Sequence, residues 1–548
     1  MAVDAPPTDR LRRFVTVVFA FSGMAALVYE VVWTRELSLV FGSTVYAVSI
    51  MLGAFMSGLS LGGFLGGRWA DSSRDLGELF AKLEFGIAMF GLLSIPLIRG
   101  LPTIYFTVYN TLHPSFVFFF GIQLALSFLV MIGPTTLMGA TFPVVSKIAS
   151  SSLDAIGRQV GSVYAVNTLG SIAGSLLAGF LFIPFIGVRG TIFVAAGINL
   201  AVSGAMMWAT RNAIAARRVA IGAAILAVAV SGSHFLPEPA VALGFYRLGR
   251  VDSLASYREA AKRMKTVFSR EGVYSDVAVV KDSDGGLSLH NGGMTEGSSY
   301  KEDGQTTHLL AYLPVAAARD PHSALVIGLG TGYTSKSLLE LPLVRVDTVE
   351  INPAVVPASR FFVGELSDDP RWNLHVTDGR NYLYRTRRTF DVITSEPSWP
   401  LNSGVSHLFT EEFFVLAREH INDGGVFCQW LPRYLLERRD FMMMYKTFHE
   451  VFPQSYVWSL DSPSVGSNEL FLVGVKGGER IDQDEVGRRV DTLLADHGFA
   501  QTPFHPFESV QTMADSLTDP TVPLNTDDHP YLEFNVVKNR IRWFNARR

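Results

Sequence analysis

The sequence predicts a chain in two parts, a bundle of membrane-spanning helices followed by a soluble α/β domain. Charged residues are rare in the first part, with 23 among residues 1–236, and frequent in the second, with 73 among residues 237–548. About 25% of the residues in an ordinary soluble domain are charged. The first part also contains seven apolar stretches of roughly the 20 residues that a spanning helix needs. In the second part, short β-rich runs alternate with helix-like segments, which is typical of a Rossmann-like sheet that is mostly parallel.

Composition excludes several classes of protein. The first 236 residues carry a net charge of +5 and the rest a net charge of −9. An acidic soluble part argues against a nucleic-acid partner, which would need a basic face for phosphates. The one cysteine, Cys428, excludes an intramolecular disulfide and any cysteine-rich metal site, and we expect no metal. Cys428 lies in an apolar run, so we interpret it as a buried strand residue and not as a nucleophile.

The membrane part, residues 1–236, has seven predicted spans, so the expected partner of this part is a lipid bilayer. The predicted spans are 14–33, 44–67, 79–98, 116–146, 160–186, 191–209 and 219–236. The fourth contains Gly133 and Pro134, so it is either one long helix, tilted or kinked, or a helix with a re-entrant piece. Glycines recur at four-residue spacing in two stripes, which favours close helix packing in a compact bundle. The stripes are Gly58, Gly62 and Gly66, and Gly170 and Gly174.

Ionisable residues at membrane depth have two possible roles. Glu30, Arg35, Glu36 and Glu84 are candidates for function because a charge in lipid is costly. Interfacial snorkelling, or an ion pair of the Glu30–Arg35 type that fixes the bundle, is the favoured explanation of the two. Residues 62–77 resemble the loop between the second and third helices of major facilitator transporters, although this chain has about half of their spans.

The soluble part begins with a predicted linker over residues 237–270, followed by a small β element and a lid-like helix over 271–320. Within that element, residues 272–293 alternate apolar and polar positions around a DSDGG turn, which predicts a β-hairpin. The Rossmann-like domain occupies residues 321–548. Its first strand, 324–327, opens into a loop that contains Gly328, Gly330 and Gly332.

Polar residues follow each of the next predicted strands. Glu350 ends the second strand, Asp378 and Gly379 follow the third, and Glu396 follows the fourth. Ligands bind at the carboxyl edge of an open α/β sheet, where glycines allow close approach and an acidic residue about 20 positions later suits ribose hydroxyls. Together these residues predict a nucleoside-binding sheet, although Asp378 alone is equally typical of a turn.

At this point the sequence resembles the spermidine synthases, aminopropyltransferases with a sheet like that of AdoMet-dependent methyltransferases. The resemblance covers roughly residues 272–432. It is carried by DGQTTHLLAYLP (303–314), VIGLGTG (326–332), VDTVEIN (346–352), DPRWNLHVTDGRNYL (369–383) and SEPSWPLNSGVSHLFTEEFF (395–414). The segments SGMAALVYEVVWTREL (22–37) and NTDDHPYLEF (525–534) are similar to those of membrane-fused spermidine synthase-like proteins of bacteria.

The resemblance implies transfer of an aminopropyl group from decarboxylated S-adenosylmethionine to an amine such as putrescine, giving spermidine or a related polyamine and methylthioadenosine. It implies that Glu350 binds the ribose and Asp378 the adenine, beside the glycines Gly328, Gly330, Gly332 and Gly379. Glu396 stands where the family has its catalytic Asp, and His308 is the second catalytic candidate. The candidate substrate-binding residues are Asp303, Thr307, Trp399, Asp527 and Asp528.

Four departures from the family pattern weaken the case for putrescine. Thr307 stands where the family has Tyr, and Leu309 where it has Glu; Thr331 and Trp399 each replace an Asp. Two alternatives therefore stay open. One is an AdoMet-dependent methyl- or other group transferase with a different acceptor, and the other is a nucleoside-binding polyamine transporter or sensor without turnover. His308 is equally explained as a core histidine, and Asp527 and Asp528 as caps of a helix or turn.

The expected location is the bacterial inner membrane, with several spans and with the soluble domain on the cytoplasmic side, where the nucleoside is supplied. The positive-inside count points the other way. With the N-terminus inside and seven spans, eleven Lys and Arg residues fall inside and three outside, which places the soluble domain outside. Splitting the fourth span would return the domain to the cytoplasm but would remove the charge bias. The resemblance also implies a homodimer.

Overall fold

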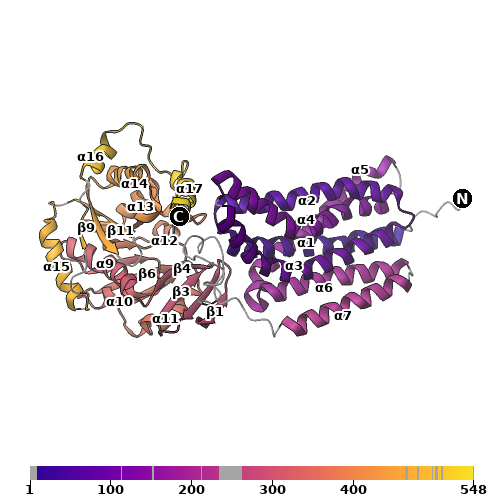
Figure 1. Ribbon diagram of the computed structural model, residues 1–548, viewed down its shortest axis with the longest axis horizontal. Coiled ribbons are helices and arrows are strands. Elements are labelled where there is room, and N and C mark those ends of the chain that lie inside the picture. Colours follow the sequence, from indigo (N-terminus) through magenta and orange to yellow (C-terminus); the bar gives the residue numbers. More distant parts are fainter. Residues whose placement is uncertain are drawn as a thin grey trace. The chain divides into compact units, whose positions relative to one another are not determined.

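The computed structural model describes residues 9–112, 114–150, 153–210, 213–233, 259, 262–462, 467–477, 480–496, 498–499, 504–507 and 510–546. The chain divides into two compact units. Helices α1 to α7 make up the first unit, and the elements from β1 to α17 make up the second (Figure 1). Each unit is described by itself.

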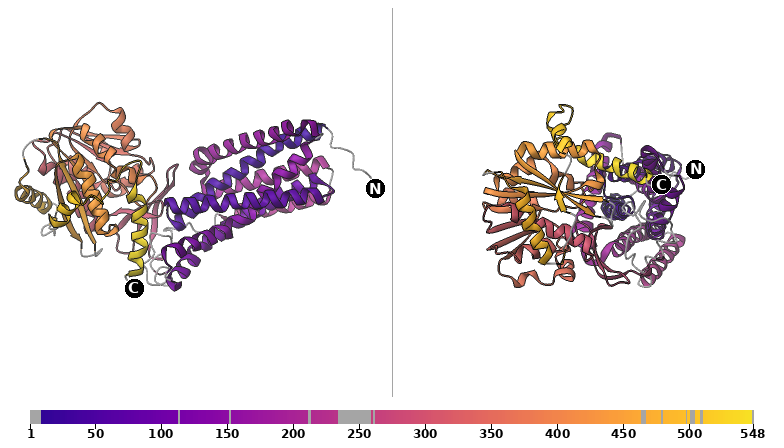
Figure 2. Two further views of the ribbon diagram at one scale, coloured as in Figure 1. Left: turned by 90° about the horizontal axis from the view of Figure 1, so that it is seen from above. Right: turned by 60° about the vertical axis from the view of Figure 1, so that its left-hand side comes forward.

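In the described part of the first unit every regular element is a helix, and the long helices run alongside one another (Figure 2). The helices are α1 (Asp9–Phe41), α2 (Val45–Ser72), α3 (Leu76–Leu112), α4 (Phe116–Ala149), α5 (Ile156–Leu177), α6 (Ile183–Thr210) and α7 (Ala213–Ser233), with a short 3-10 turn η1 (Leu153–Ala155) and a π-helical turn η2 (Ala178–Phe182). Pro134 lies inside α4, which stays one continuous helix. The split of the fourth predicted span is therefore not observed.

Among the residues that the structure describes, five helical segments are long and apolar enough to cross a membrane, by length and composition. The predicted count of seven spans is not confirmed. The fifth and sixth predicted spans form one apolar run, Ile156–Thr210, which is interrupted by non-helical backbone at Gly187. The seventh coincides with α7, whose apolar stretch Ala220–Val230 is shorter than the roughly 20 residues that a bilayer needs.

Both glycine stripes lie where helices touch. A methyl group built on Gly62 would lie 2.0 Å from the backbone oxygen of Thr136 in α4, and one on Gly58 would lie 1.7 Å from the Thr135 hydroxyl. On α5, a methyl group on Gly170 would lie 1.9 Å from the backbone oxygen of Ala20 in α1. Real Cβ atoms do not approach that closely, so the stripes set the spacing of α2 on α4 and of α5 on α1.

One buried carboxyl group joins three helices of this unit. The Glu84 side chain on α3 is fully buried and accepts hydrogen bonds from Ser22 on α1 and from Asn199 on α6. Buried polar groups at membrane depth are costly unless they are paired, and here both carboxyl oxygens have partners. The pairing of Glu84 supports a structural role in the bundle.

The second unit begins with a four-stranded antiparallel sheet in the order β1-β2-β3-β4. Its strands are β1 (Lys265–Glu271), β2 (Asp276–Lys281), β3 (Leu287–Asn291) and β4 (Met294–Ser298). The predicted hairpin corresponds to β2 and β3. Residues 265–270, expected to be linker, form most of β1, where they pair with β2; the rest of the predicted linker lies almost wholly outside the described residues.

The main sheet has eight strands in the order β12-β10-β11-β9-β8-β5-β6-β7. The strands from β9 to β7 are parallel to one another, whereas β11, β10 and β12 extend the sheet in antiparallel pairing. The bounds are β5 (Ser323–Ile327), β6 (Arg345–Glu350), β7 (Trp372–Val376), β8 (Phe390–Ser395), β9 (Ile421–Pro432), β10 (Gln454–Ser462), β11 (Ser467–Val475) and β12 (Phe504–Pro506). Cys428 is fully buried in β9, as predicted.

Helices pack on both faces of this sheet, with α13 and α14 on one side and α9 and α10 on the other (Figure 1). The helices are α9 (Lys301–Ala317), α10 (Tyr333–Leu339), α11 (Val355–Val363), α12 (Gly379–Arg385), α13 (Glu411–Glu419), α14 (Arg438–Val451), α15 (Gln483–Asp496), α16 (Val510–Thr518) and α17 (Tyr531–Ala546), with 3-10 turns η4 (Leu366–Asp368), η5 (Val405–Phe409) and η6 (Arg433–Leu435). The predicted α/β domain with a small β element is thus observed.

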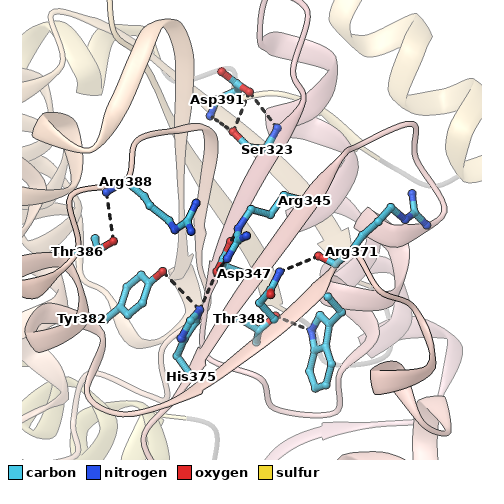
Figure 3. Close-up of polar contacts among 12 residues, drawn as sticks. Ser323, Arg345, Asp347, Thr348, Arg371, His375, Tyr382, Thr386, Arg388 and Asp391 are labelled. Atoms are coloured by element: carbon cyan, nitrogen blue, oxygen red, sulfur yellow. Dashed lines mark hydrogen bonds and ion pairs between the residues drawn. The ribbon is translucent and has the colours of Figure 1, made fainter.

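Two buried or half-buried aspartates hold the strands in place (Figure 3). Asp391 accepts hydrogen bonds from the backbone N–H groups of His322 and Ser323, both at 2.9 Å, and so fixes the start of β5 beside β8. Asp347, fully buried in β6, pairs with Arg345 and, at 2.7 Å, with His375 of β7. The Asp391 contacts lie at the ends of β5 and β8 opposite to those that carry the candidate site, and the Asp347 contact joins β6 to β7.

Candidate active site

A cavity of about 510 Å³ lies in the second unit at the carboxyl ends of the parallel strands. The glycine loop after β5, the ends of β6, β7 and β8, and strand β4 of the small sheet all contribute to its lining. Ligands of open α/β sheets bind at this edge. The lining includes six carboxylate side chains: Glu296, Asp303, Glu350, Asp378, Glu396 and Glu469.

The glycine loop brings the backbone close to Glu396. Gly328 has a φ of +101°, and a methyl group built on it would lie 2.6 Å from the backbone oxygen of Glu396. Gly330 has a φ of +51° and has no atom within 4 Å of such a methyl position. Gly332 has a φ of +89° and precedes α10, outside the cavity lining. The first two glycines therefore shape the cavity wall, and the third shapes the turn behind it.

Glu350 and Asp378 stand at the ends of two neighbouring strands and both line the cavity. The carboxyl group of Glu350 accepts backbone hydrogen bonds from Leu329 at 3.0 Å and from Asn352 at 2.8 Å, so its position is fixed by the glycine loop. Burial raises the pKa of Glu350, and these backbone donors oppose the rise. Asp378 caps α12 by accepting from the Asn381 N–H at 2.9 Å, so it serves as a helix cap as well as part of the lining.

Glu396 follows β8 directly and faces the same cavity. Its carboxyl group accepts a hydrogen bond from the Thr334 hydroxyl at 3.0 Å. Burial raises the pKa of Glu396 to about 7, and the nearby charge of Asp303 adds to the rise. A carboxyl group with a pKa near neutral pH can accept a proton from a substrate, so the geometry suits general-base catalysis.

Glu296 is a second carboxyl group of this kind, and the sequence reasoning missed it. It lies on β4 and accepts a hydrogen bond from the Ser398 hydroxyl at 2.6 Å. Burial raises the pKa of Glu296 to about 7, and the charges of Glu350 and Glu396 add to the rise. An acid within the small-residue strand MTEGS was the signal available in the sequence. A methyl group on the adjacent Gly297 would lie 3.0 Å from the Thr331 side chain, so β4 packs against the glycine loop.

The sequence-predicted residues divide into two groups. Asp303, Thr307 and Trp399 line the cavity, together with Gly379. His308, Asp527 and Asp528 are not part of the lining. The His308 ring contacts the Ser337 hydroxyl through Nδ1 at 2.6 Å and packs on Tyr312 and Phe499, which fits the interpretation as a core histidine. A catalytic role for His308 stays a prediction.

Asp527 acts on the cavity through Arg380. Its two carboxyl oxygens each accept a hydrogen bond from the Arg380 guanidinium at 2.7 Å, and Arg380 lines the cavity next to Asp378. This pairing lowers the pKa of Asp527 to about 2. Asp528 is exposed. Direct substrate contacts by Asp527 and Asp528 stay predictions, and the structure shows Asp527 as a residue that positions Arg380.

Comparison with known proteins identifies a domain family for the part of the chain that carries this site. Residues 305–484 match the model of the spermine/spermidine synthase domain. The chain contains a spermidine synthase domain. The resemblance predicted from the sequence motifs is thereby confirmed, together with the aminopropyltransferase class of enzyme that it implies.

Relatives of this spermidine synthase domain match either nearly the whole chain or a shorter part of it. A polyamine aminopropyltransferase of Oceanobacillus iheyensis is 24% identical over 539 residues, which are 93% of this chain and 97% of that protein. One of Thermococcus onnurineus is 33% identical over 169 residues, 30% of this chain and 60% of that protein. Among solved structures, the spermidine synthase of Thermotoga maritima is similar to this chain with a TM-score of 0.35 and 22% identity. The match covers 41% of this chain and 78% of that one.

Within the described part of the chain, no group of three His, Cys, Asp or Glu side chains is arranged to hold a metal ion. The lining of the cavity includes carboxylates, glycines and aromatic rings, together with aliphatic and hydroxyl side chains. Such a lining suits an organic cation with a nucleoside portion.

Proposed function

We propose that the chain transfers the aminopropyl group of decarboxylated S-adenosylmethionine to an amine such as putrescine, giving spermidine or a related polyamine and methylthioadenosine. The observation that carries this proposal is the cavity in which six carboxylates surround a glycine loop of the nucleoside-binding type. Both substrates are cations, one a sulfonium and the other an ammonium, and carboxylates in a shielded cavity attract them.

The same charges favour the decarboxylated nucleoside over S-adenosylmethionine itself. S-adenosylmethionine carries a carboxylate at the far end of the three-carbon chain on its sulfonium, and that group would enter a cavity that also holds Glu296, Asp303 and Glu396. Among the described residues of the lining, Arg380 is the one permanently charged cation, and Asp527 already pairs with it. A like charge in a cavity of low dielectric is unfavourable, which supports the decarboxylated donor.

In this proposal Glu396 is the general base. The bound amine loses a proton to the Glu396 carboxylate, and its nitrogen lone pair attacks the methylene carbon beside the sulfonium. A C–N bond forms, the C–S bond breaks with its electron pair moving to sulfur, and methylthioadenosine leaves as a neutral thioether. Thr334 orients the carboxylate through its hydrogen bond at 3.0 Å, and Glu350 and Asp378 are the candidates to hold the ribose and the adenine. Alignment of amine and methylene carbon supplies much of the rate.

A product assay on the detergent-solubilised full chain tests this function. Decarboxylated S-adenosylmethionine and S-adenosylmethionine are offered separately with a panel of amines, and mass spectrometry follows the nucleoside and amine products. Methylthioadenosine in equal amount with an aminopropylated amine is the expected result. S-adenosylhomocysteine formed from S-adenosylmethionine would instead show a methyltransferase. Binding of methylthioadenosine without any turnover would overturn the enzyme proposal in favour of a sensor.

We also propose that the apolar helices anchor the chain in the bacterial inner membrane with the spermidine synthase domain on the cytoplasmic side. The five long apolar segments support the anchoring, and the cytosolic origin of the nucleoside supports the side. A reporter fused after Arg548 that is active only in the periplasm would contradict this orientation. The homodimer implied by the family stays a prediction.

A further inference from the structure

We infer that Arg540, on the last helix of the chain, is a positioning residue for the segment that carries Glu396. It acts through Trp399, which lies three residues after Glu396 and lines the cavity. Helix α17 lies outside residues 305–484, which match the family model. The inference rests on the proposed function for the role of Glu396, whereas the contacts of Arg540 are independent of that function.

Arg540 is a buried cation that packs on an aromatic ring of the cavity wall. Its side chain is 1% exposed, and the guanidinium carbon lies 5.3 Å from the centroid of the Trp399 ring. Cation–π interactions act within about 6 Å and strengthen where water is excluded. A buried charge has a desolvation cost that an apolar side chain of similar length would avoid. The arginine at this position therefore favours a use of its charge beyond the filling of space.

Trp399 has a second defined contact, on the side of the turn η6. Its ring meets the Tyr434 ring edge to face, with centroids 5.6 Å apart, and both rings line the cavity. Contacts with Arg540 and Tyr434 together restrict the orientation of the indole. Trp399 is one of the four departures from the family pattern, so this arrangement does not follow from the resemblance.

Holding Trp399 restricts its neighbours in the chain. Ser398 directly precedes it, and the Ser398 hydroxyl donates a hydrogen bond to Glu296 at 2.6 Å. Glu396 stands two residues before Ser398. The segment 396–399 therefore links both buried carboxyl groups of the cavity to the ring that Arg540 contacts.

Helix α17 is itself held against both turns that flank this segment. The buried Ser406 hydroxyl of η5 donates to the buried Glu533 carboxyl at 2.9 Å, and Asn539 donates to the Leu435 backbone oxygen of η6 at 3.3 Å. Glu533 and Arg540 are seven residues apart, so they lie on one face of the helix, about 10 Å apart along its axis. The helix thus offers a fixed base from which Arg540 can hold Trp399.

The test is a double-mutant cycle between Arg540 and Trp399 in the full chain. Initial rates with saturating decarboxylated S-adenosylmethionine and putrescine are measured for the wild type, Arg540→Met, Trp399→Leu and the double variant. Calorimetric titration with methylthioadenosine counts the active sites, so a partly unfolded sample cannot imitate the effect. We expect kcat per active site to fall at least about tenfold in Arg540→Met, since a misplacement of about 1 Å can cost about 100-fold. In the Trp399→Leu background, Arg540→Met should have no further effect.

Two more variants complete the cycle. Arg540→Lys keeps the positive charge and should retain more activity than Arg540→Met. The control is Arg542→Met, because Arg542 lies on the same helix, is exposed and pairs with Glu437 at 2.8 Å; it should keep the wild-type kcat. If Arg540→Met does not fold, the cycle is run with Arg540→Lys, whose smaller loss must also vanish in the Trp399→Leu background. An equal fold-loss in both backgrounds, or wild-type kcat in Arg540→Met, overturns the inference.

Hydrogen–deuterium exchange followed by mass spectrometry separates this inference from the function on which it rests. In Arg540→Met, the backbone amides of residues 398–409 should exchange at least about threefold faster than in the wild type, and in Arg542→Met they should not. If the wild type turns over no amine, the proposed function fails, and faster exchange in this segment still supports positioning by Arg540. Exchange there that matches the wild type overturns the inference.

Discussion

Replacing Glu396 by Gln removes the proton acceptor and keeps the size of the side chain. The Thr334 hydroxyl can still donate to the amide oxygen, so the loop should hold its position. Loss of a general base typically costs a factor of 100 to 10,000 in rate. We expect kcat for amine transfer to fall by at least about 100-fold, with methylthioadenosine affinity unchanged within about threefold because Glu350 and Asp378 remain.

The raised pKa of Glu396 adds a pH signature to this experiment. The carboxyl group must be ionised to accept a proton, and its pKa is about 7 in the folded protein. Activity should therefore rise with pH, so that kcat/KM at pH 6 is about tenfold below its value at pH 8. The amine, with a pKa near 10, stays protonated over this range, so the enzyme carboxyl governs the change.

The assay is a pH series of initial rates from pH 5.5 to 8.5 with methylthioadenosine detected by mass spectrometry. In Glu396→Gln we expect a low residual rate that does not rise with pH around pH 7. Wild-type turnover in the variant would refute the role of Glu396. If the variant has a reduced rate that still rises with pH around pH 7, the titration belongs to another group. Glu296 is then the first candidate because its pKa is also about 7.

Three further predictions follow from the site and its supports. In Glu296→Gln, the apparent pKa of kcat/KM should shift downward because a like charge next to Glu396 is removed; a pH profile that matches the wild type would contradict this. Asp527→Asn should lower the free energy of unfolding at pH 7 by about 1–2 kcal/mol, after allowance for partial exposure, because it loses the ion pair with Arg380. The folded-state pKa of Asp527 is lowered to about 2, so the difference in unfolding free energy between wild type and variant should shrink as the pH falls from about 4 toward 2. Urea melts at pH 7 and pH 3 measure this difference. Gly328→Ala should weaken methylthioadenosine binding at least tenfold, because its methyl group would meet the Glu396 backbone oxygen. The control is Gly477→Ala, where φ is also positive, at +69°, but no atom lies within 4 Å of the added methyl group. Equal affinity in both variants would contradict the steric argument.

The sequence could group several residues of the cavity lining because each of them follows a parallel strand. Short apolar runs identify such strands, and their carboxyl ends meet at one edge, so Gly328, Glu350, Asp378 and Glu396 could be grouped without a structure. Glu296 and Glu469 could not be found this way. Their proximity to Glu396 depends on how the small sheet meets the glycine loop and on the register of β11 with β9, and neither can be read from local periodicity.

In the membrane part, the sequence predicted the local features better than the number of spans. Hydropathy located the apolar helices, and the glycine stripes identified which faces pack closely. The count of seven spans is not confirmed, because residues 156–210 form one apolar run broken at Gly187 and the apolar stretch in α7 is short. His308 carried a motif match, yet its ring contacts Ser337, Tyr312 and Phe499 and not the cavity, and only the packing of α9 could show this.

The antiparallel extension of the sheet has a consequence for how such a site can change during evolution or in the laboratory. The glycine loop, Glu350 and Asp378 lie between residues 328 and 379, whereas Trp430 and Glu469 lie on β9 and β11. The cavity residues predicted to bind the nucleoside and those on the antiparallel extension are therefore encoded by separate stretches of the chain. Exchange of β11 alone, residues 467–475, would change one wall of the cavity and leave the glycine loop, Glu350 and Asp378 in place.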